Sequence, residues 1–383
     1  LTPGNFFEKG GFKPNNGKER YYTGTYPKEY LCHKGDLIVA MTQQAEGLLG
    51  STALVPENDK YLHNQRIGLI TCDEKRLNKL FAYYLFMTKS VREQLERSSS
   101  GTKVKHTSPE KIYDVEVEIP DVISQQKIAN LLWSIDEKIA NNNAINDNLE
   151  QQAKLLYNYW FIQFNFPDEN GNPYHSSGGQ LVWNKNLQQE IPQDWRSGNL
   201  YDIADYINGI ACQKYRPSDE EHSLPVVKIR EMNGGITNDT ERVSSTIPAK
   251  NIISSGDILF SWSASLEVIM WYGVDAGLNQ HIFKVVPKSY FSSEYVYLQL
   301  SEYLIHFIKI AEARKTTMGH ITSEHLQDSH IILPPANIIK NFSEYVRPIY
   351  QMKKQIANET SELIKLRDWL IPMLMNGQAT ISD

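Results

Sequence analysis

Two stretches of the chain carry apolar residues at alternating spacings of four and three, the pattern of a helix that packs along one seam against a partner helix. The first stretch starts at Ile128 and reaches Trp160, and the second runs from Phe342 to Leu370. A lone helix would leave this stripe in water, so we expect the two helices to pair, antiparallel. The alternative is that each helix is buried in its own domain. The predicted seam contains Ile128, Leu132, Ile135, Ile139, Leu149, Leu156, Ile349, Ile356, Leu363, Leu366 and Leu370.

Polar residues and prolines interrupt these two predicted helices. Asn142 and Asn358 lie near the seam, where a buried amide would fix the register of the pair, although a solvated position fits either residue as well. Pro348 and Pro372 lack a backbone donor and crowd the preceding turn, so we expect them to kink or end the second helix.

The other segments alternate short β-branched runs, such as 37–39 and 258–260, with turn residues, which predicts two β-rich globular parts. Helices inside these parts are expected over 78–97 and 294–314, where aromatic and aliphatic residues recur at helical spacing. Residues 167–179 are rich in Pro, Gly, Asn and Ser and are predicted to form a surface connection.

The two halves of the chain share short motifs in the same order and at nearly constant offsets of 221, 215 and 217 positions, which indicates an internal duplication. The matching motifs are Gly35-Asp36 and Gly256-Asp257, Asn64-Gln65 and Asn279-Gln280, and Ile139-Ala140-Asn141 and Ile356-Ala357-Asn358. The second copy begins near Ile191, so the equivalent start of the first copy would precede Leu1. We therefore expect the first copy to lack its opening.

Composition narrows the possible functions. A chain of 383 residues with 41% apolar and 22% charged residues suits two or three folded domains. The net charge of −6 requires any nucleic-acid binding to rest on local patches. The three cysteines stand too far apart for a disulfide framework or a structural zinc site. No apolar run approaches the length of a membrane span, and we expect a cytoplasmic protein.

Three segments resemble catalytic motifs, but none has the residues or the spacing that the motif requires. Asn172-Pro173-Tyr174 lacks the second proline of the pocket found in amino-methyltransferases. Gly11 and Gly17 are separated by five residues, where a phosphate-binding loop has four. Asp136 and Lys138 belong to a helical pattern that turns them to different faces. We therefore predict no catalytic residue and no metal site in this chain.

Two short basic and polar loops, 97–107 and 314–322, stand at equivalent points of the two copies, and cations with hydroxyls suit phosphate oxygens and guanine edges. Two further candidate segments, one in each copy, interleave aromatic residues with cations. Solvated loops and a packed tyrosine surface are the alternatives. The predicted DNA-binding residues are Lys13, Lys18, Arg20, Tyr21, Lys103, Lys105, His106, Thr107, Gln213, Lys214, Tyr215, Arg216, Lys228, Arg230, Arg314, Lys315, Thr316, Thr317 and His320.

In their order along the chain, these motifs resemble the specificity subunit of type I restriction-modification systems, over essentially the whole chain. The resemblance rests on the Gly-Asp and Asn-Gln pairs given above, the loops before Thr107 and Thr322, Ile119-Pro120 and Leu333-Pro334, Gln125-Gln126-Lys127-Ile128, Ile135-Asp136-Glu137-Lys138-Ile139, Ile191-Pro192-Gln193-Asp194-Trp195, and Leu366-Arg367-Asp368-Trp369-Leu370-Ile371-Pro372.

The resemblance implies an α+β fold in which two β-rich target-recognition domains in pseudo-twofold arrangement are separated by an antiparallel pair of long coiled-coil helices. The implied domains are 1–120 (recognition domain 1, lacking its opening), 121–165 (central spacer helix), 166–190 (linker), 191–335 (recognition domain 2) and 336–383 (C-terminal spacer helix).

The implied function is to read a bipartite, asymmetric site on double-stranded DNA. The chain would be no enzyme itself but a scaffold for two adenine-methylating modification subunits and a restriction and translocation subunit. S-adenosylmethionine, ATP and Mg would belong to those partners. The alternative is a truncated specificity fragment that mainly binds modification subunits and has one working DNA reader.

Overall fold

The structure, a computed structural model, describes residues 1–15, 17, 19–43, 45, 47–101, 104–218, 222–313 and 320–381. The chain divides into two units, Leu1–Ala140 with Ser361–Asp383 (unit 1) and Asn141–Thr360 (unit 2). The division falls inside both long helices, α4 (Val122–Tyr157) and α9 (Ala336–Met375), so each unit contains part of each helix. Within the described residues, no helix is both long and apolar enough to cross a membrane.

Unit 1 is built around a small antiparallel sheet with the strand order β3-β2-β5. The central strand β2 (Leu37–Ala40) pairs with β3 (Thr52–Leu54) and with β5 (Ile67–Ile70). All four residues of β2 are buried, which explains why this run is apolar without alternation. A second pair of short strands joins β1 (Leu31–Cys32) to β4 (Tyr61–Leu62).

Unit 2 repeats this order in the sheet β14-β13-β16-β9. Its central strand β13 (Ile258–Ser261) lies between β14 (Glu267–Met270) and β16 (Ile282–Pro287), and all four residues of β13 are buried. A fourth strand, β9 (Ala204–Asn208), pairs with β16. The shared order of the first three strands is what the duplication in the sequence predicts.

The remaining elements complete the two units. In unit 2, β10 (Ser223–Val227), β11 (Arg242–Ser244), β12 (Ile252–Ile253) and β15 (Ala276–Leu278) form one sheet, β6 (Leu181–Asn184) pairs with β7 (Gln189–Pro192), and β8 (Arg196–Gly198) pairs with β17 (Ile331–Leu333). The shorter helices are α1 (Lys79–Leu85), α2 (Lys89–Ser98), α3 (Pro109–Tyr113), α5 (Leu200–Ile203), α6 (Ile229–Gly234), α7 (Ser293–Ala313) and α8 (Ser323–Gln327), and a π-helical turn (Asn158–Ile162) follows α4.

The repeated Gly-Asp pair forms the same turn before the central strand of each sheet. Gly35 and Gly256 have φ angles of 83° and 109°, a region that glycine reaches without steric cost. The following aspartate accepts a backbone hydrogen bond at 2.7 Å in both turns, Asp36 from His33 and Asp257 from Ser254. This pair is therefore required by turn geometry.

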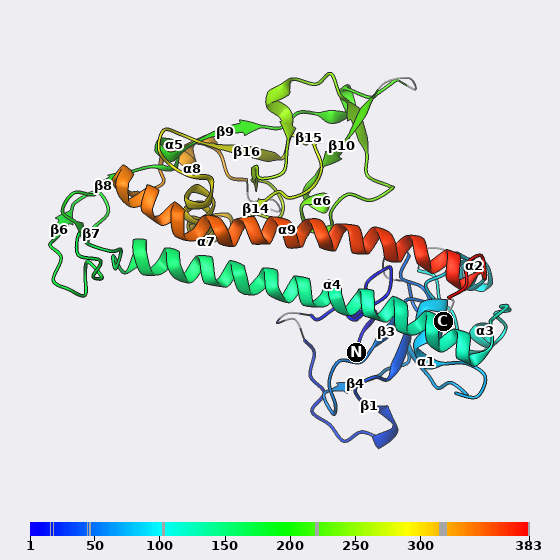
Figure 1. The fold of residues 1–383 in the computed structure, drawn as a ribbon. Coiled ribbons are helices and arrows are strands. Elements are labelled where there is room, and N and C mark those ends of the chain that lie inside the picture. Colours follow the sequence, from blue (N-terminus) through cyan, green and yellow to red (C-terminus); the bar gives the residue numbers. More distant parts are fainter. Residues whose placement is uncertain are drawn as a thin grey trace. The chain divides into compact units, whose positions relative to one another are not determined.

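In both units, α4 and α9 pack side by side and antiparallel (Figure 1). In unit 2, Asn142 is buried and donates to Glu359 Oε2 at 2.9 Å and to Thr360 Oγ1 at 3.2 Å. Lys353 of α9 forms an ion pair with Glu150 of α4. Of the two alternatives left open by the sequence, the buried position holds for Asn142, which connects the helices, and the solvated one for Asn358, which is exposed.

The same helices meet in unit 1 around Asp136. The Asp136 carboxylate accepts from Arg367 Nη1 at 2.8 Å and from the Tyr84 hydroxyl at 2.6 Å. Burial and the neighbouring Asp136 carboxylate raise the pKa of Tyr84 well above its usual value. Burial alone would lower the pKa of Arg367, but its hydrogen bond with Asp136 raises it. The guanidinium therefore stays charged at the interface.

Apolar residues of both helices enter the cores of the units. In unit 1, Leu132 of α4 and Leu374 of α9 belong to the same buried cluster as Phe81 of α1. In unit 2, the rings of Tyr157 of α4 and Phe342 of α9 lie 6.3 Å apart within one buried cluster. The predicted antiparallel pairing of the two helices and the α+β fold are confirmed.

The structure corrects three local predictions. Leu366 is 44% exposed, because Arg367 takes the inward position beside it. Pro348 and Pro372 do not end the second helix, since α9 continues through both. The helix predicted over 78–97 is two helices, α1 and α2, because Thr88 caps a new start by accepting from Val91 N. The other seam positions are buried or half-buried.

Asp136→Asn tests the contribution of the ion pair in unit 1. The change removes the negative charge that Arg367 and Tyr84 face, and we expect the free energy of unfolding to fall by about 1.5–3 kcal/mol, as for other hydrogen bonds to charged groups. Urea unfolding measures it. Glu362→Gln is the control, because its pair with Lys365 is exposed and should add little. Equal stability of the Asp136 variant and the control would contradict this account.

Candidate functional site

The Asn-Gln pair of unit 1 forms a tight turn that leads into β5. Asn64 Oδ1 accepts from Arg66 N at 2.8 Å, and the Asn64 carbonyl accepts from Ile67 N at 2.9 Å. The carbonyl of Arg66 in turn accepts from Met41 N at 2.9 Å, just after β2. The side chains of Gln65 and Arg66 are exposed. The turn is therefore held by its backbone and by Asn64, and it presents the two residues that follow.

The Asn-Gln pair of unit 2 makes the same three hydrogen bonds. Asn279 Oδ1 accepts from His281 N at 3.4 Å, and the Asn279 carbonyl accepts from Ile282 N at 3.1 Å. The carbonyl of His281 accepts from Trp262 N at 3.3 Å, just after β13. Each unit thus contains one copy of a common turn, and the residue after Gln is arginine in one copy and histidine in the other.

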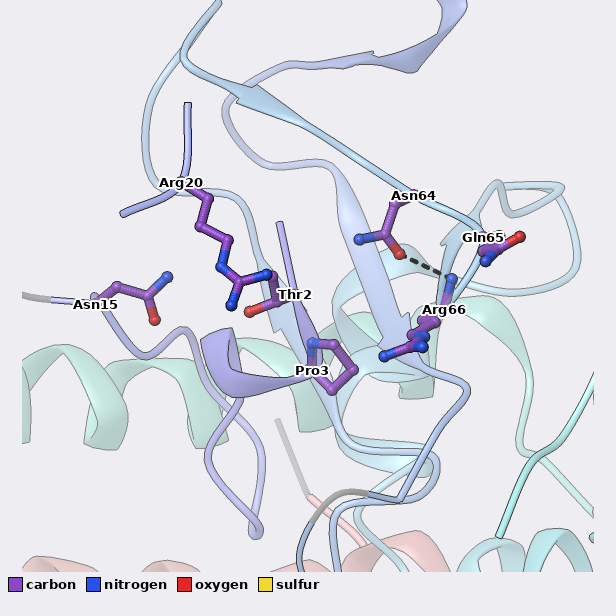
Figure 2. A pocket seen from close by; sticks show the side chains of 7 residues that line it. All are labelled: Thr2, Pro3, Asn15, Arg20, Asn64, Gln65 and Arg66. Carbon is purple, nitrogen blue, oxygen red and sulfur yellow. Dashed lines mark hydrogen bonds between the residues drawn. The ribbon is translucent and has the colours of Figure 1, made fainter. Parts of the chain in front are cut away.

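In unit 1, the turn borders an open hollow of about 680 Å³. Figure 2 shows Arg20, Asn64 and Arg66 around it, together with residues near the start of the chain. Arg20 and Arg66 are exposed, and neither forms an ion pair with an acid within the described part of the chain. The hollow therefore joins two guanidinium groups to amide side chains, a set that suits anionic or base-edge ligands.

The loop predicted over 97–107 is fastened beside the same strand. Within its described residues, Ser100 and His106 exchange backbone hydrogen bonds of 3.0 and 2.8 Å. Thr107 N donates to Met41 O at 2.9 Å, and Thr42 Oγ1 lies 3.1 Å from His106 Nδ1. The loop and the Asn-Gln turn therefore both attach at the end of β2.

In unit 2, Trp262 occupies the corresponding place after β13. Its ring centroid lies 5.6 Å from that of His281 and 5.7 Å from that of His320, and its Nε1 donates to Asn208 Oδ1 at 3.1 Å. Trp262 O accepts from Ile321 N at 3.0 Å, so the second loop also attaches here. In unit 2, an aromatic and imidazole cluster thus stands beside the Asn-Gln turn.

The structure separates the predicted DNA-binding residues into three groups. Several cations are paired with acids: Lys105 with Glu96, Lys228 with Glu241, and Arg230 with Glu231. His106 and Thr107 anchor the first loop, and His320 lies against Trp262. The exposed residues are Lys13, Arg20, Tyr21, Gln213, Lys214, Tyr215 and Arg216; Lys18, Lys103, Arg314, Lys315, Thr316 and Thr317 lie outside the described residues.

The sequence reasoning did not assign a binding role to Gln65, Arg66, Trp262 or His281. The signal was present in the Asn-Gln pair, which recurs in both copies. The pair served as evidence for the duplication. The hydrogen bond between its turn and the end of the central strand is seen only in the structure. Which of the predicted residues contact DNA remains a prediction.

Comparison with known proteins assigns the family. A family model described as the type I restriction modification DNA specificity domain matches residues 6–151 and 192–366, which are the two copies of the repeat. The chain belongs to this family. It is a specificity protein of a type I restriction-modification system, and its role is to recognise DNA sequence.

Individual relatives agree with this assignment. The chain is 25% identical over 317 residues to the MjaIX specificity subunit of Methanocaldococcus jannaschii, which covers 79% of this chain and 69% of that protein. It is 22% identical over 409 residues to the HindI specificity subunit of Haemophilus influenzae, covering 90% and 86%. Its fold is similar to that of the type I S subunit from M. genitalium, with a TM-score of 0.53 and 16% identity over 92% of this chain and 85% of that one.

Arg20→Ala tests whether the hollow of unit 1 is part of the DNA interface. Loss of one phosphate contact should weaken binding and reduce the slope of log K against log salt concentration by about 0.9. Titration of labelled duplex DNA at several salt concentrations measures both. Arg76→Ala is the control, because Arg76 is also exposed but lies in the turn before α1, where its carbonyl accepts from Gln125 of α4. An unchanged slope for the Arg20 variant would exclude a phosphate contact.

Proposed function

We propose that this chain is the non-catalytic specificity subunit that reads a bipartite, asymmetric DNA site and holds the subunits that methylate and cleave DNA. The observation that carries the proposal is the common Asn-Gln turn, which presents Arg66 in unit 1 and His281 in unit 2. Two readers with one scaffold and different side chains suit a site with two different halves.

The long helices suit the spacing of such a site. Helix α4 has 36 residues, which corresponds to roughly 54 Å at about 1.5 Å per residue. One turn of DNA is about 34 Å. Helices of this length would let two readers address successive major grooves. Because the chain carries a net charge of −6, strong nonspecific binding is not expected from it alone.

The reactions are assigned to partner subunits in this proposal. Two modification subunits would supply the adenine-methylating site with S-adenosylmethionine, and a restriction subunit would use ATP and Mg. No cofactor is proposed for this chain, because its sequence contains no convincing methyltransferase or phosphate-loop motif. Because double-stranded DNA is its ligand, we place the protein in the cytoplasm.

Exposed apolar residues on the helices are candidates for the contact with modification subunits. Leu155, Tyr159 and Ile162 follow one another at helical spacing in unit 2 and are 68%, 38% and 52% exposed. In unit 1, Trp369 of α9 is 58% exposed. Covering such side chains with a partner is favourable, because it removes apolar surface from water.

Methylome sequencing tests the proposed function as a whole. A host that expresses this chain with its cognate modification subunit should methylate adenines in a motif of two different half-sites separated by a fixed unspecified spacer. The control host expresses the modification subunit alone and should lack this motif. A palindromic motif, or none, would instead favour a fragment with one reader or a scaffold only.

Leu155→Glu combined with Ile162→Glu tests the subunit contact. Charges on this face should weaken binding of the modification subunit by about tenfold or more, since tenfold corresponds to about 1.4 kcal/mol and one buried apolar side chain can supply that much. Isothermal titration measures the affinity. Asn143→Glu is a matched control at an exposed polar position of the same helix. Equal affinities of the double variant and the control would place the contact elsewhere.

A further inference from the structure

We infer that the residue after each Asn-Gln pair, Arg66 in unit 1 and His281 in unit 2, reads a base in its half-site. This inference rests on the proposed DNA recognition and assigns a specificity-determining position within it. The position is the same in both copies of the repeat, but the chemistry of the side chain differs.

The argument starts with the backbone. In both turns, the asparagine side chain accepts a hydrogen bond from the backbone N–H of the second residue after it. The carbonyl of that residue, Arg66 or His281, accepts from the backbone N–H of the residue that follows the central strand. The side chain therefore starts from an equivalent point in each unit. A change of residue at this point alters what is presented while the turn keeps its hydrogen bonds.

The chemistry of Arg66 indicates guanine. Its side chain is exposed beside the hollow in Figure 2 and has no acidic partner among the residues that the structure describes. A guanidinium presents two parallel N–H donors, which match N7 and O6 of guanine in the major groove. A lysine would keep the charge but lose this paired geometry, so the two residues are not equivalent at a base edge.

The chemistry of His281 indicates a different base contact. The imidazole is half-buried, lies 5.6 Å from the Trp262 ring and approaches Gln280 Nε2 through its own Nε2 at 3.4 Å. An imidazole nitrogen forms one hydrogen bond where a guanidinium forms two. The two half-sites should therefore differ at the base that this position contacts.

Substitutions at the two positions, read out by methylome sequencing, test this inference. The chain is expressed whole, with its wild-type modification subunit, as wild type, Arg66→Lys, Arg66→His and His281→Arg. Both Arg66 variants should lose a preference for guanine of about 5- to 150-fold at one position of one half-site, which is the discrimination that a bidentate contact supplies. The other half-site should stay unchanged. His281→Arg should alter only that other half-site.

The controls separate the possible failures. Arg76→Lys changes an exposed arginine elsewhere in unit 1 and should leave the motif intact. A further variant, Arg66→Ala, removes the charge as well. If Arg66→Lys keeps the wild-type motif while Arg66→Ala lowers methylation at every site, Arg66 contacts phosphate, and the inference is overturned. A wild-type motif without guanine in either half-site also overturns it. If the wild-type chain directs no split motif at all, the proposed function itself fails.

Discussion

One interaction recurs in both units, where an acid of α4 forms an ion pair with a cation of α9. Asp136 pairs with Arg367 in unit 1, and Glu150 pairs with Lys353 in unit 2. Positions 136 and 353 are related by the repeat offset of 217, as are positions 150 and 367, so the four residues occupy two pairs of equivalent sites. The first copy carries an acid at both sites and the second a cation. An α4 helix is therefore attracted to α9, whereas two α4 helices in the same register would oppose like charges.

These ion pairs also connect the helices to the part of each unit that carries the candidate site. The Tyr84 hydroxyl of α1 donates to Asp136, and the Tyr297 hydroxyl of α7 donates to Glu150 at 3.0 Å. Both tyrosines are buried, and burial is the main reason that the pKa of each is raised, so the phenols remain donors. In each unit, one carboxylate of α4 thus binds both a cation of α9 and a tyrosine hydroxyl of a shorter helix, α1 or α7, and so connects three helices. In each unit, the helix pair and the globular part therefore form one folded structure.

The sequence predicts what depends on local periodicity and misses what depends on distant partners. The seam was recognisable because apolar spacing alone defines a helix face, as at Leu132. The inward position of Arg367 in place of Leu366 could not be recognised in this way, because Arg367 bonds to Asp136, more than two hundred residues earlier in the chain. The loop cations show the same limit. Lys228 was predicted to contact DNA, but it follows β10, and the antiparallel pairing of β10 with β11 brings it beside Glu241, with which it forms an ion pair. The Asn-Gln pair was visible in the sequence as a repeat. Its hydrogen bonds with Met41 in unit 1 and Trp262 in unit 2 depend on how the strands pair, which the sequence alone does not give.

The shared turn explains how one scaffold can serve two different readers. Its hydrogen bonds use backbone groups and one asparagine, so they impose no chemistry on the residue after the glutamine. Arg66 is exposed and His281 is half-buried, and neither side chain takes part in these hydrogen bonds. Arginine and histidine can therefore occupy equivalent positions while the central strands β2 and β13 stay fully buried. The physical consequence is a separation of tasks, in which the buried strands and the turn asparagines maintain the fold and the residue after the glutamine can differ between the two units.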